Sequence, residues 1–177
     1  MKNVLTVFLS FLIFAGVSNA QNAAFSQYTL GSGDTVRITV YGQDDLSLET
    51  RLTDVGVVNY PYLGEISVLG MTVSQLETFI YDGLKGDYLV NPSVSVSIIE
   101  YRPFFINGEV KNPGGYPFQP GLTIDKAAAL AGGYTERASK TKIYIDRTIN
   151  GKQVTLNANR YMQILPGDII NIDQSFF

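Results

Sequence analysis

The stretch FINGEVKNPGGYPFQPGLTIDKAAALAGGY, from Phe105 to Tyr134, decides the fold of the second half of the chain. It begins inside an apolar run, 104–110, that predicts a strand, and the N-P-G-G sequence at 112–115 is typical of a turn. Thr123 has the place of a helix N-cap, and Gly132-Gly133 predicts the end of that helix. The apolar stripe of the helix consists of Ile124, Ala127, Ala128 and Ala131, and Asp125 lies in its first turn.

Strands follow this helix up to the end of the chain. Alternating patterns predict strands over 142–146 and 153–157, and Asn150-Gly151-Lys152 predicts the hairpin turn between them. A last strand is expected over 169–172. One helix among several strands indicates a small mixed domain.

The first half of the chain predicts a second unit of the same kind. Residues 35–40 alternate as a half-buried strand, 43–53 are expected to be irregular, and 54–70 to hold turns and short strands. Thr72 and Gln75 form a capping box at the start of a helix that stops near Gly86, and a further strand follows over 93–98. We therefore expect an α+β protein of two small mixed domains.

A short motif occurs twice. GSGDTVRI at 31–38 and LPGDIINI at 165–172 both place Gly-Asp directly before an alternating strand. Glycine supplies a backbone conformation that other residues resist, and the aspartate carboxylate can accept backbone N–H groups at the strand entrance. The two copies predict equivalent turns that open the first unit and close the second.

The N-terminus predicts export from the cytoplasm. Residues 1–20, MKNVLTVFLSFLIFAGVSNA, place one positive charge before an apolar run and end on small residues. This order is typical of a secretory signal peptide, here cleaved after Ala20. The apolar run of about 14 residues is shorter than the ~20 residues that span a bilayer as a helix. We expect a signal peptide over 1–20 and a polar leader over 21–27.

The composition limits the partners. The chain has 13 lysines and arginines against 16 aspartates and glutamates and a net charge of −3, without a basic cluster. Nucleic acid binding needs a basic face that neutralises phosphates, so we do not expect it. With no cysteine, the chain has no disulfide and no attachment site for a bacterial lipid anchor. No segment after the signal has the ~18 consecutive apolar residues of a membrane-spanning helix.

The chain contains neither histidine nor cysteine. Imidazole catalysis, Ser-His-Asp triads, thiol nucleophiles and the usual zinc sites are therefore excluded, and we expect no catalytic residue, metal or cofactor. A glycosidase or lyase with two carboxylates stays open, because that chemistry needs only paired acids. The conspicuous acids have structural explanations instead, since Asp34 and Asp168 belong to turns. Gly31-Ser32-Gly33 leads into a strand, unlike a phosphate-binding loop.

Three blocks together resemble the outer-membrane polysaccharide export family of the Wza type. YTLGSGDTVRITVY at 28–41 is similar to the opening strand of its polysaccharide-export domain. DVGVVNYPYLGEISVLGMTVSQLETFI at 54–80 has the order of glycine turn, Tyr-Pro, Leu-Gly and helix, and N-P-S-V at 91–94 matches the closing strand. The stretch from Phe105 to Tyr134 and the LPGDIINI segment resemble the soluble-ligand-binding β-grasp (SLBB) module.

The resemblance implies an architecture and a role. It implies a polysaccharide-export domain over 28–100, an SLBB domain over 103–174 and no enzymatic activity. Copies would assemble into a ring in the periplasm, associated with the outer membrane, and conduct a capsular polysaccharide or a biofilm exopolysaccharide. Long members carry a second β-grasp module and a C-terminal amphipathic helix that are absent here. We therefore expect a short form that works with an inner-membrane copolymerase or tyrosine kinase and with a separate outer-membrane β-barrel.

Other roles stay open. The main alternative is a monomeric periplasmic module that binds a saccharide or a peptidoglycan fragment, and the carboxylate enzyme is the third. The final Ser175-Phe176-Phe177 is also typical of outer-membrane barrel proteins, but two capped helices and short strands argue against a barrel.

Two groups of residues are candidates for the functional site. Aromatic rings can stack on sugar faces, although most of the eleven tyrosines are expected to be half-buried structural residues. The candidate saccharide contacts lie in or near predicted loops: Tyr60, Tyr62, Tyr116 and Tyr134. The residues expected to form the structural turns of the family motif are Gly33, Asp34, Pro61, Gly64, Gly108, Pro113, Gly114, Gly132, Gly133, Gly167 and Asp168.

Overall fold

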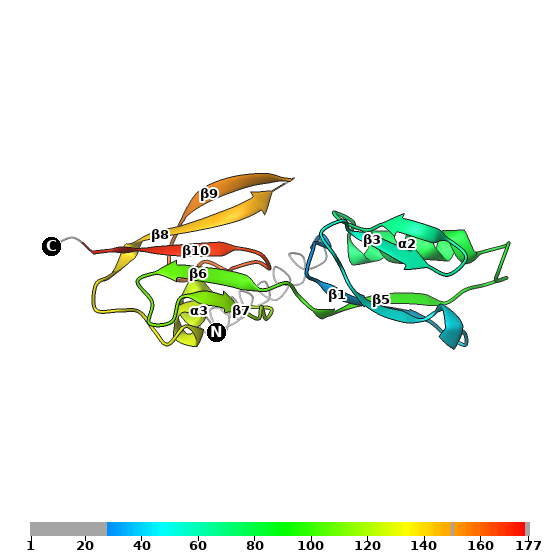
Figure 1. Ribbon diagram of the computed structural model, residues 1–177, viewed down its shortest axis with the longest axis horizontal. Coiled ribbons are helices and arrows are strands. Elements are labelled where there is room, and N and C mark those ends of the chain that lie inside the picture. Colours follow the sequence, from blue (N-terminus) through cyan, green and yellow to red (C-terminus); the bar gives the residue numbers. More distant parts are fainter. Residues whose placement is uncertain (1–27, 150, 176–177) are drawn as a thin grey trace, which may run out of the picture.

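The computed structural model describes residues 28–149 and 151–175, so the predicted signal peptide and leader, Asn150 and the last two phenylalanines lie outside the described residues. The chain forms two hydrophobic cores, each with its own sheet. The first core draws on residues from Leu30 to Val96 and the second on residues from Phe104 to Ile172. The two domains of an α+β protein lie end to end, with the connection from β5 to β6 between them (Figure 1).

The N-terminal domain packs one helix and a hairpin on a three-stranded sheet. The antiparallel sheet has the order β2-β1-β5, and β3 and β4 form the separate hairpin. The element bounds are β1 Thr35–Val40, η1 Asp44–Leu46, β2 Leu48–Arg51, β3 Val57–Tyr60, β4 Gly64–Ser67, α2 Val73–Leu84 and β5 Val94–Glu100.

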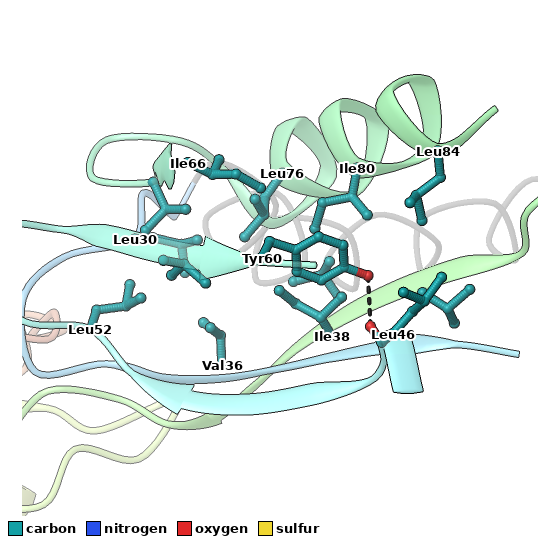
Figure 2. Packing of buried hydrophobic residues seen from close by; sticks show 14 residues of the cluster. Leu30, Val36, Ile38, Leu46, Leu52, Tyr60, Ile66, Leu76, Ile80 and Leu84 are labelled. Carbon is teal, nitrogen blue, oxygen red and sulfur yellow. Dashed lines mark hydrogen bonds between the residues drawn. The ribbon is translucent and has the colours of Figure 1, made fainter. Parts of the chain in front are cut away.

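The predicted capping box at the start of α2 is confirmed. The Thr72 hydroxyl accepts the Gln75 amide at 3.2 Å, and the Gln75 side chain accepts the Thr72 amide at 2.8 Å. Leu76, Ile80 and Leu84 are fully buried at one-turn spacing and face the sheet (Figure 2). This one-sided burial fixes α2 over the sheet.

The C-terminal domain covers one face of a five-stranded sheet with a short helix. The strand order is β7-β6-β10-β8-β9, with β10 parallel to β6 and the other pairs antiparallel. This arrangement is β-grasp-like. Thr123 caps α3 through its hydroxyl, as predicted. Within the described part of the chain, no helix is long and apolar enough to cross a membrane. The bounds are β6 Phe104–Gly108, β7 Gly114–Tyr116, α3 Ile124–Leu130, β8 Ala138–Ile149, β9 Lys152–Ala158 and β10 Ile169–Gln174.

The structure corrects the sequence reading in two places. Residues 43–53 are not irregular, because they hold η1 and the edge strand β2, whose Glu49 pairs with Arg37 of β1 at 2.7 Å. Polar edge strands carry little hydrophobic signal. The glycines at 114–115 belong to strand β7 rather than to a turn. A Cβ at Gly115 would lie 2.9 Å from Cε1 of the exposed Phe105 ring, so this ring would have to shift to admit a side chain there.

The predicted strands also differ in length. Strand β6 ends at Gly108, before the expected Val110, because the φ of 83° at Gly108 departs from an extended backbone. Glycine is required there, since a Cβ would lie 2.1 Å from the Ile172 carbonyl oxygen. The β8–β9 hairpin is longer than expected, and its pairing continues to Ile149 opposite Lys152.

Candidate functional site

The two Gly-Asp turns, 33–34 and 167–168, have the same local geometry. Their glycines have φ values of 92° and 83°, in the region that favours glycine. The aspartate carboxylates accept the amides of Gly31 and Leu165, each three positions earlier, at 2.8 and 2.7 Å. The aspartate amides donate back to the carbonyls of the same two residues. The repeated motif in the sequence is therefore a repeated turn.

Each turn also buries its carboxylate against an arginine. Asp34 and Asp168 are 0% and 1% exposed. Asp168 receives two guanidinium N–H groups of Arg147, at 2.9 and 2.6 Å. Asp34 receives the backbone amide of Arg102 at 2.7 Å and pairs with the Arg102 guanidinium at 3.4 Å. A buried carboxylate requires such partners, so both aspartates have a structural role.

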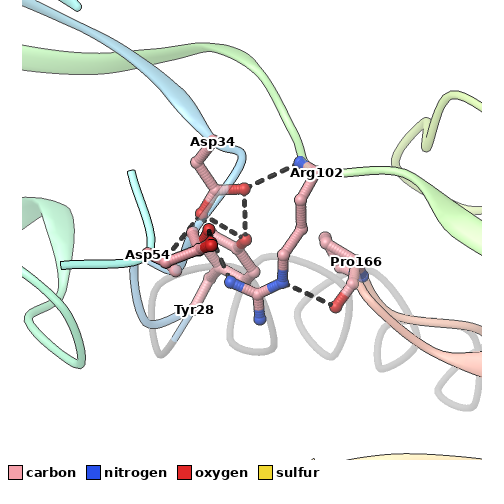
Figure 3. Close-up of polar contacts among 7 residues, drawn as sticks. Tyr28, Asp34, Asp54, Arg102 and Pro166 are labelled. Carbon is pink, nitrogen blue, oxygen red and sulfur yellow. Dashed lines mark hydrogen bonds and ion pairs between the residues drawn. The ribbon is translucent and has the colours of Figure 1, made fainter. Parts of the chain in front are cut away.

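Arg102 touches both turns at once (Figure 3). While its Nη1 faces Asp34, its Nε donates to the carbonyl of Pro166 at 3.2 Å. Both turn glycines lie against it, because a Cβ on Gly33 would meet the Arg102 Cβ at 3.2 Å and one on Gly167 would meet its Nε at 2.7 Å. One side chain therefore links the first turn of the N-terminal domain to the last turn of the C-terminal domain.

Aromatic rings extend this junction from one domain to the other. The Tyr28 hydroxyl lies 2.7 and 2.8 Å from the two carboxylate oxygens of Asp34. Its ring contacts Tyr101 edge to face at 5.3 Å, and Tyr101 contacts Phe118 of the C-terminal core in the same way at 5.4 Å. Burial, followed by the hydrogen bond to Asp34 and the charge of that carboxylate, raises the pKa of Tyr28. This hydroxyl therefore stays protonated and continues to donate.

A groove of about 530 Å³ lies beside the junction and takes its walls from both domains. That volume and the location between domains are typical of ligand sites. Arg51 and Glu100 come from the N-terminal domain, are exposed, and form no ion pair with another described residue. The aromatic lining consists of Tyr101, Tyr116 and Phe118.

Of the predicted saccharide contacts, only Tyr116 lines this groove. It is half-buried, its ring lies 6.0 Å from Phe104, and its hydroxyl donates to the Asn112 carbonyl at 2.6 Å. Tyr60 is 1% exposed and donates its hydroxyl to the Leu46 carbonyl at 2.6 Å (Figure 2). The prediction for Tyr60 is wrong, because a buried ring has no face to offer a sugar.

The other two predicted tyrosines lie away from the groove. Tyr62 is 66% exposed and stacks on Tyr88 with ring centroids 4.6 Å apart. Tyr134 is half-buried and donates its hydroxyl to Asp125 at 3.2 Å. Burial and then this hydrogen bond raise the pKa of Tyr134 to about 12. The structure therefore does not bring the four predicted tyrosines together.

The remaining predicted turn residues have local roles in their domains. Pro61 and Gly64 lie at the β3–β4 hairpin, Pro113 precedes β7, and Gly114 is the first residue of that strand. Gly132 and Gly133 follow α3 with φ values of 83° and 93°. None of these residues lines the groove.

Sequence reasoning missed the residues that join the domains. Arg102 and Tyr28 form no motif by themselves, and their partner Asp34 is 68 positions from Arg102. The only available signal was the repeat of the Gly-Asp turn, which predicted two acceptors but not their donors. In the described ranges, no three or more acidic side chains come together as metal ligands.

Comparison with known proteins gives two family matches in the order of the two domains. Residues 22–99 match the family described as polysaccharide biosynthesis/export protein, and residues 103–157 match the SLBB domain.

Curated relatives show the same likeness. The chain is 32% identical over 139 residues to the exopolysaccharide production protein ExoF of Rhizobium meliloti, which covers 71% of this chain and 32% of the relative. It is 28% identical over 166 residues to the polysialic acid transport protein KpsD of Escherichia coli, with 89% and 29% covered. It is 26% identical over 188 residues to the EPS I polysaccharide export outer membrane protein EpsA of Ralstonia nicotianae, with 86% and 49% covered. The chain thus spans about a third to a half of the length of these relatives.

Proposed function

This chain belongs to the polysaccharide biosynthesis/export protein family, and we propose that it is a non-catalytic periplasmic component of a system that exports a capsular polysaccharide or an exopolysaccharide. The observation that carries the proposal is the pair of family matches in tandem, 22–99 and 103–157, on a chain whose two domains are joined through Arg102. In this role, copies form a ring associated with the outer membrane. The polymer passes from an inner-membrane copolymerase or tyrosine kinase towards an outer-membrane partner.

The state of the carboxylates supports a role without catalysis. A two-carboxylate glycosidase needs one acid that can donate a proton and one free carboxylate across a sugar bond. Asp34 and Asp168, the most buried acids, are held by arginines and backbone amides inside their own turns. Because both are buried, they do not face a substrate.

The groove between the domains supports contact with the polymer. Tyr101 and Tyr116 offer partly exposed rings, while Arg51 and Glu100 offer a donor and an acceptor for sugar hydroxyls. Because the walls come from both domains, the angle between the domains sets the width of the groove.

Deletion of the gene tests the export role. We expect the strain to lose its surface polysaccharide, measured by a uronic acid or total sugar assay on washed cells, and the wild-type gene to restore it. Surface polysaccharide at the wild-type level in the deletion strain would contradict the export role.

The ring requires a separate test. Multi-angle light scattering on the exported, processed protein should give a mass that is a multiple of the monomer, alone or with its inner-membrane and outer-membrane partners. A protein that stays strictly monomeric under all these conditions would instead favour the monomeric saccharide-binding module. The groove could bind a saccharide in a monomer as well as in a ring.

A further inference from the structure

Tyr62 has an unusual backbone for its residue type. Its φ is 65°, and within residues 28–149 and 151–175 it is the one residue other than glycine with a positive φ. Bulky side chains rarely adopt this conformation, and strained residues of this kind concentrate at functional sites. Glycine would relieve the strain at this position.

The residues next to Tyr62 in the hairpin are anchored without its ring. On one side Tyr60 is buried and bonded to Leu46, and on the other side Leu63 packs against the N-terminal core and lies close to Gly83. These two anchors fix the hairpin, while the Tyr62 side chain between them is 66% exposed. Folding of the hairpin therefore does not explain why an aromatic residue occupies this position.

The Tyr62 ring is held by a second exposed tyrosine. Tyr88 is 46% exposed, its ring lies at 4.6 Å and 25° to that of Tyr62, and its hydroxyl points to the Tyr62 carbonyl at 3.5 Å. Tyr88 belongs to the loop between α2 and β5, at the end of the N-terminal domain that is farthest from the C-terminal domain (Figure 1). The pair is thus preorganised and lies apart from the groove at the junction.

We propose that the Tyr62–Tyr88 pair is a saccharide-stacking platform, a second contact for the exported polymer. This inference rests on the proposed function. The two tyrosines are 66% and 46% exposed, so a sugar can reach the rings with its C–H face, and the exposed carboxylate of Asp87, next to Tyr88, can accept sugar hydroxyls. Aromatic rings beside a carboxylate suit both the C–H faces and the hydroxyls of a saccharide, so we assign the platform to the polymer rather than to a protein partner.

The decisive variant is Tyr62→Gly, because it removes the ring and relieves the backbone at the same time. The probe is a set of short oligosaccharides made by partial hydrolysis of the polymer that the source strain exports, titrated by calorimetry into the exported, processed protein. We expect Tyr62→Gly to weaken binding about tenfold without lowering the thermal unfolding temperature. Tyr88→Ala should weaken binding to a similar extent.

Tyr161→Ala is the matched control, because Tyr161 is a 70% exposed tyrosine in the other domain. This variant should bind the oligosaccharides like the wild type. The proposal is overturned if the wild type does not bind the oligosaccharides or if both platform variants bind them unchanged. It is also overturned if Tyr62→Gly keeps its saccharide affinity but no longer binds the inner-membrane partner, which would assign the pair to a protein contact. The two proposals can also fail separately. If the deletion strain lacks surface polysaccharide but both platform variants bind the oligosaccharides like the wild type, this inference is wrong and the export role stands.

Discussion

The two Gly-Asp turns share a backbone, a buried carboxylate and an arginine, yet their arginines come from different places. Asp168 takes Arg147 from a neighbouring strand of its own sheet, 21 positions away. Asp34 takes Arg102 from the segment between the domains, 68 positions away, and Arg102 also bonds to Pro166 in the other domain. The same local motif therefore closes a sheet in one copy and joins two domains in the other.

This difference has a consequence for the groove. Its walls belong to both domains, so its shape depends on Arg102, which contacts both turns but is bound by the carboxylate of the first turn alone. The Asp168 carboxylate stabilises the domain that carries Tyr116 but binds Arg147 instead of Arg102. We therefore expect substitutions at the two turns to cost similar unfolding free energy in their own domains. They should differ in whether the other domain is also destabilised.

The largest effect is expected from Asp34→Ala, compared with Asp168→Ala. Each substitution leaves a partly buried arginine without its carboxylate, which costs about 3 to 5 kcal/mol of unfolding free energy. Asp34→Ala should weaken protection of backbone amides in its own domain and at the C-terminal residues that contact Arg102. Asp168→Ala should act in the C-terminal domain alone.

Amide hydrogen exchange, measured residue by residue at equal denaturant, separates the two outcomes. If Asp34→Ala left protection at 165–168 and at Phe118 unchanged, the first turn would not couple the domains.

A smaller effect is expected from Gly33→Ala, with Gly42→Ala as its control. Both glycines have left-handed φ values, 92° and 78°, so an alanine at either position costs about 1 to 2 kcal/mol. Only Gly33 lies against Arg102, whereas a Cβ on Gly42 meets nothing within 4 Å. In urea unfolding, Gly33→Ala should therefore lose about 1 kcal/mol more unfolding free energy than Gly42→Ala. Equal losses of unfolding free energy in the two variants would show that Arg102 moves away from the new methyl group without cost.

The last effect is expected from Tyr28→Phe and depends on pH, because the variant loses a hydrogen-bond donor to Asp34 at neutral pH and also a titrating hydroxyl at alkaline pH. Burial and Asp34 raise the pKa of Tyr28 in the folded protein, while an unfolded tyrosine titrates near its ordinary value of about 10. Above that pH the unfolded state loses its proton first, so this tyrosine lowers stability as pH rises, by up to about 1.4 kcal/mol per pH unit. Tyr28→Phe should remove this part of the alkaline decline.

Urea midpoints measured on either side of about pH 10 provide the comparison. Tyr134 donates its hydroxyl to Asp125 and does not contact either turn carboxylate. A substitution at Tyr134 should therefore leave the contribution of Tyr28 to the alkaline decline in place. An alkaline slope that is the same with and without Tyr28 would contradict the assigned hydrogen bond.

Local patterns in the sequence were sufficient for most of the fold. Both helices begin at the predicted threonine caps, and β1 has the predicted bounds, because capping and alternation are properties of adjacent residues. Strand β2 was missed, since a polar edge strand is defined by its partner. The turns at Asp34 and Asp168 were predictable as acceptors for the same local reason.

The site was less predictable than the fold. Nothing in the sequence around Tyr60 and Tyr62 tells which ring points inward, because that depends on the register of β3 against β4 and on the position of Leu46. The donors to Asp34 lie in separate parts of the chain, and only the packing of two domains brings Arg102 and Pro166 together. Long-range contacts of this kind leave no local pattern.

The most direct test of the junction is the relative orientation of the domains in solution, measured by residual dipolar couplings on backbone amides. For the wild type we expect the couplings of both domains to fit one alignment tensor, and for Arg102→Met we expect the two tensors to diverge while each domain keeps its fold. Wild-type domains that already require two different tensors, or an Arg102→Met variant with the wild-type orientation, would contradict the claim that this arginine holds the two domains together.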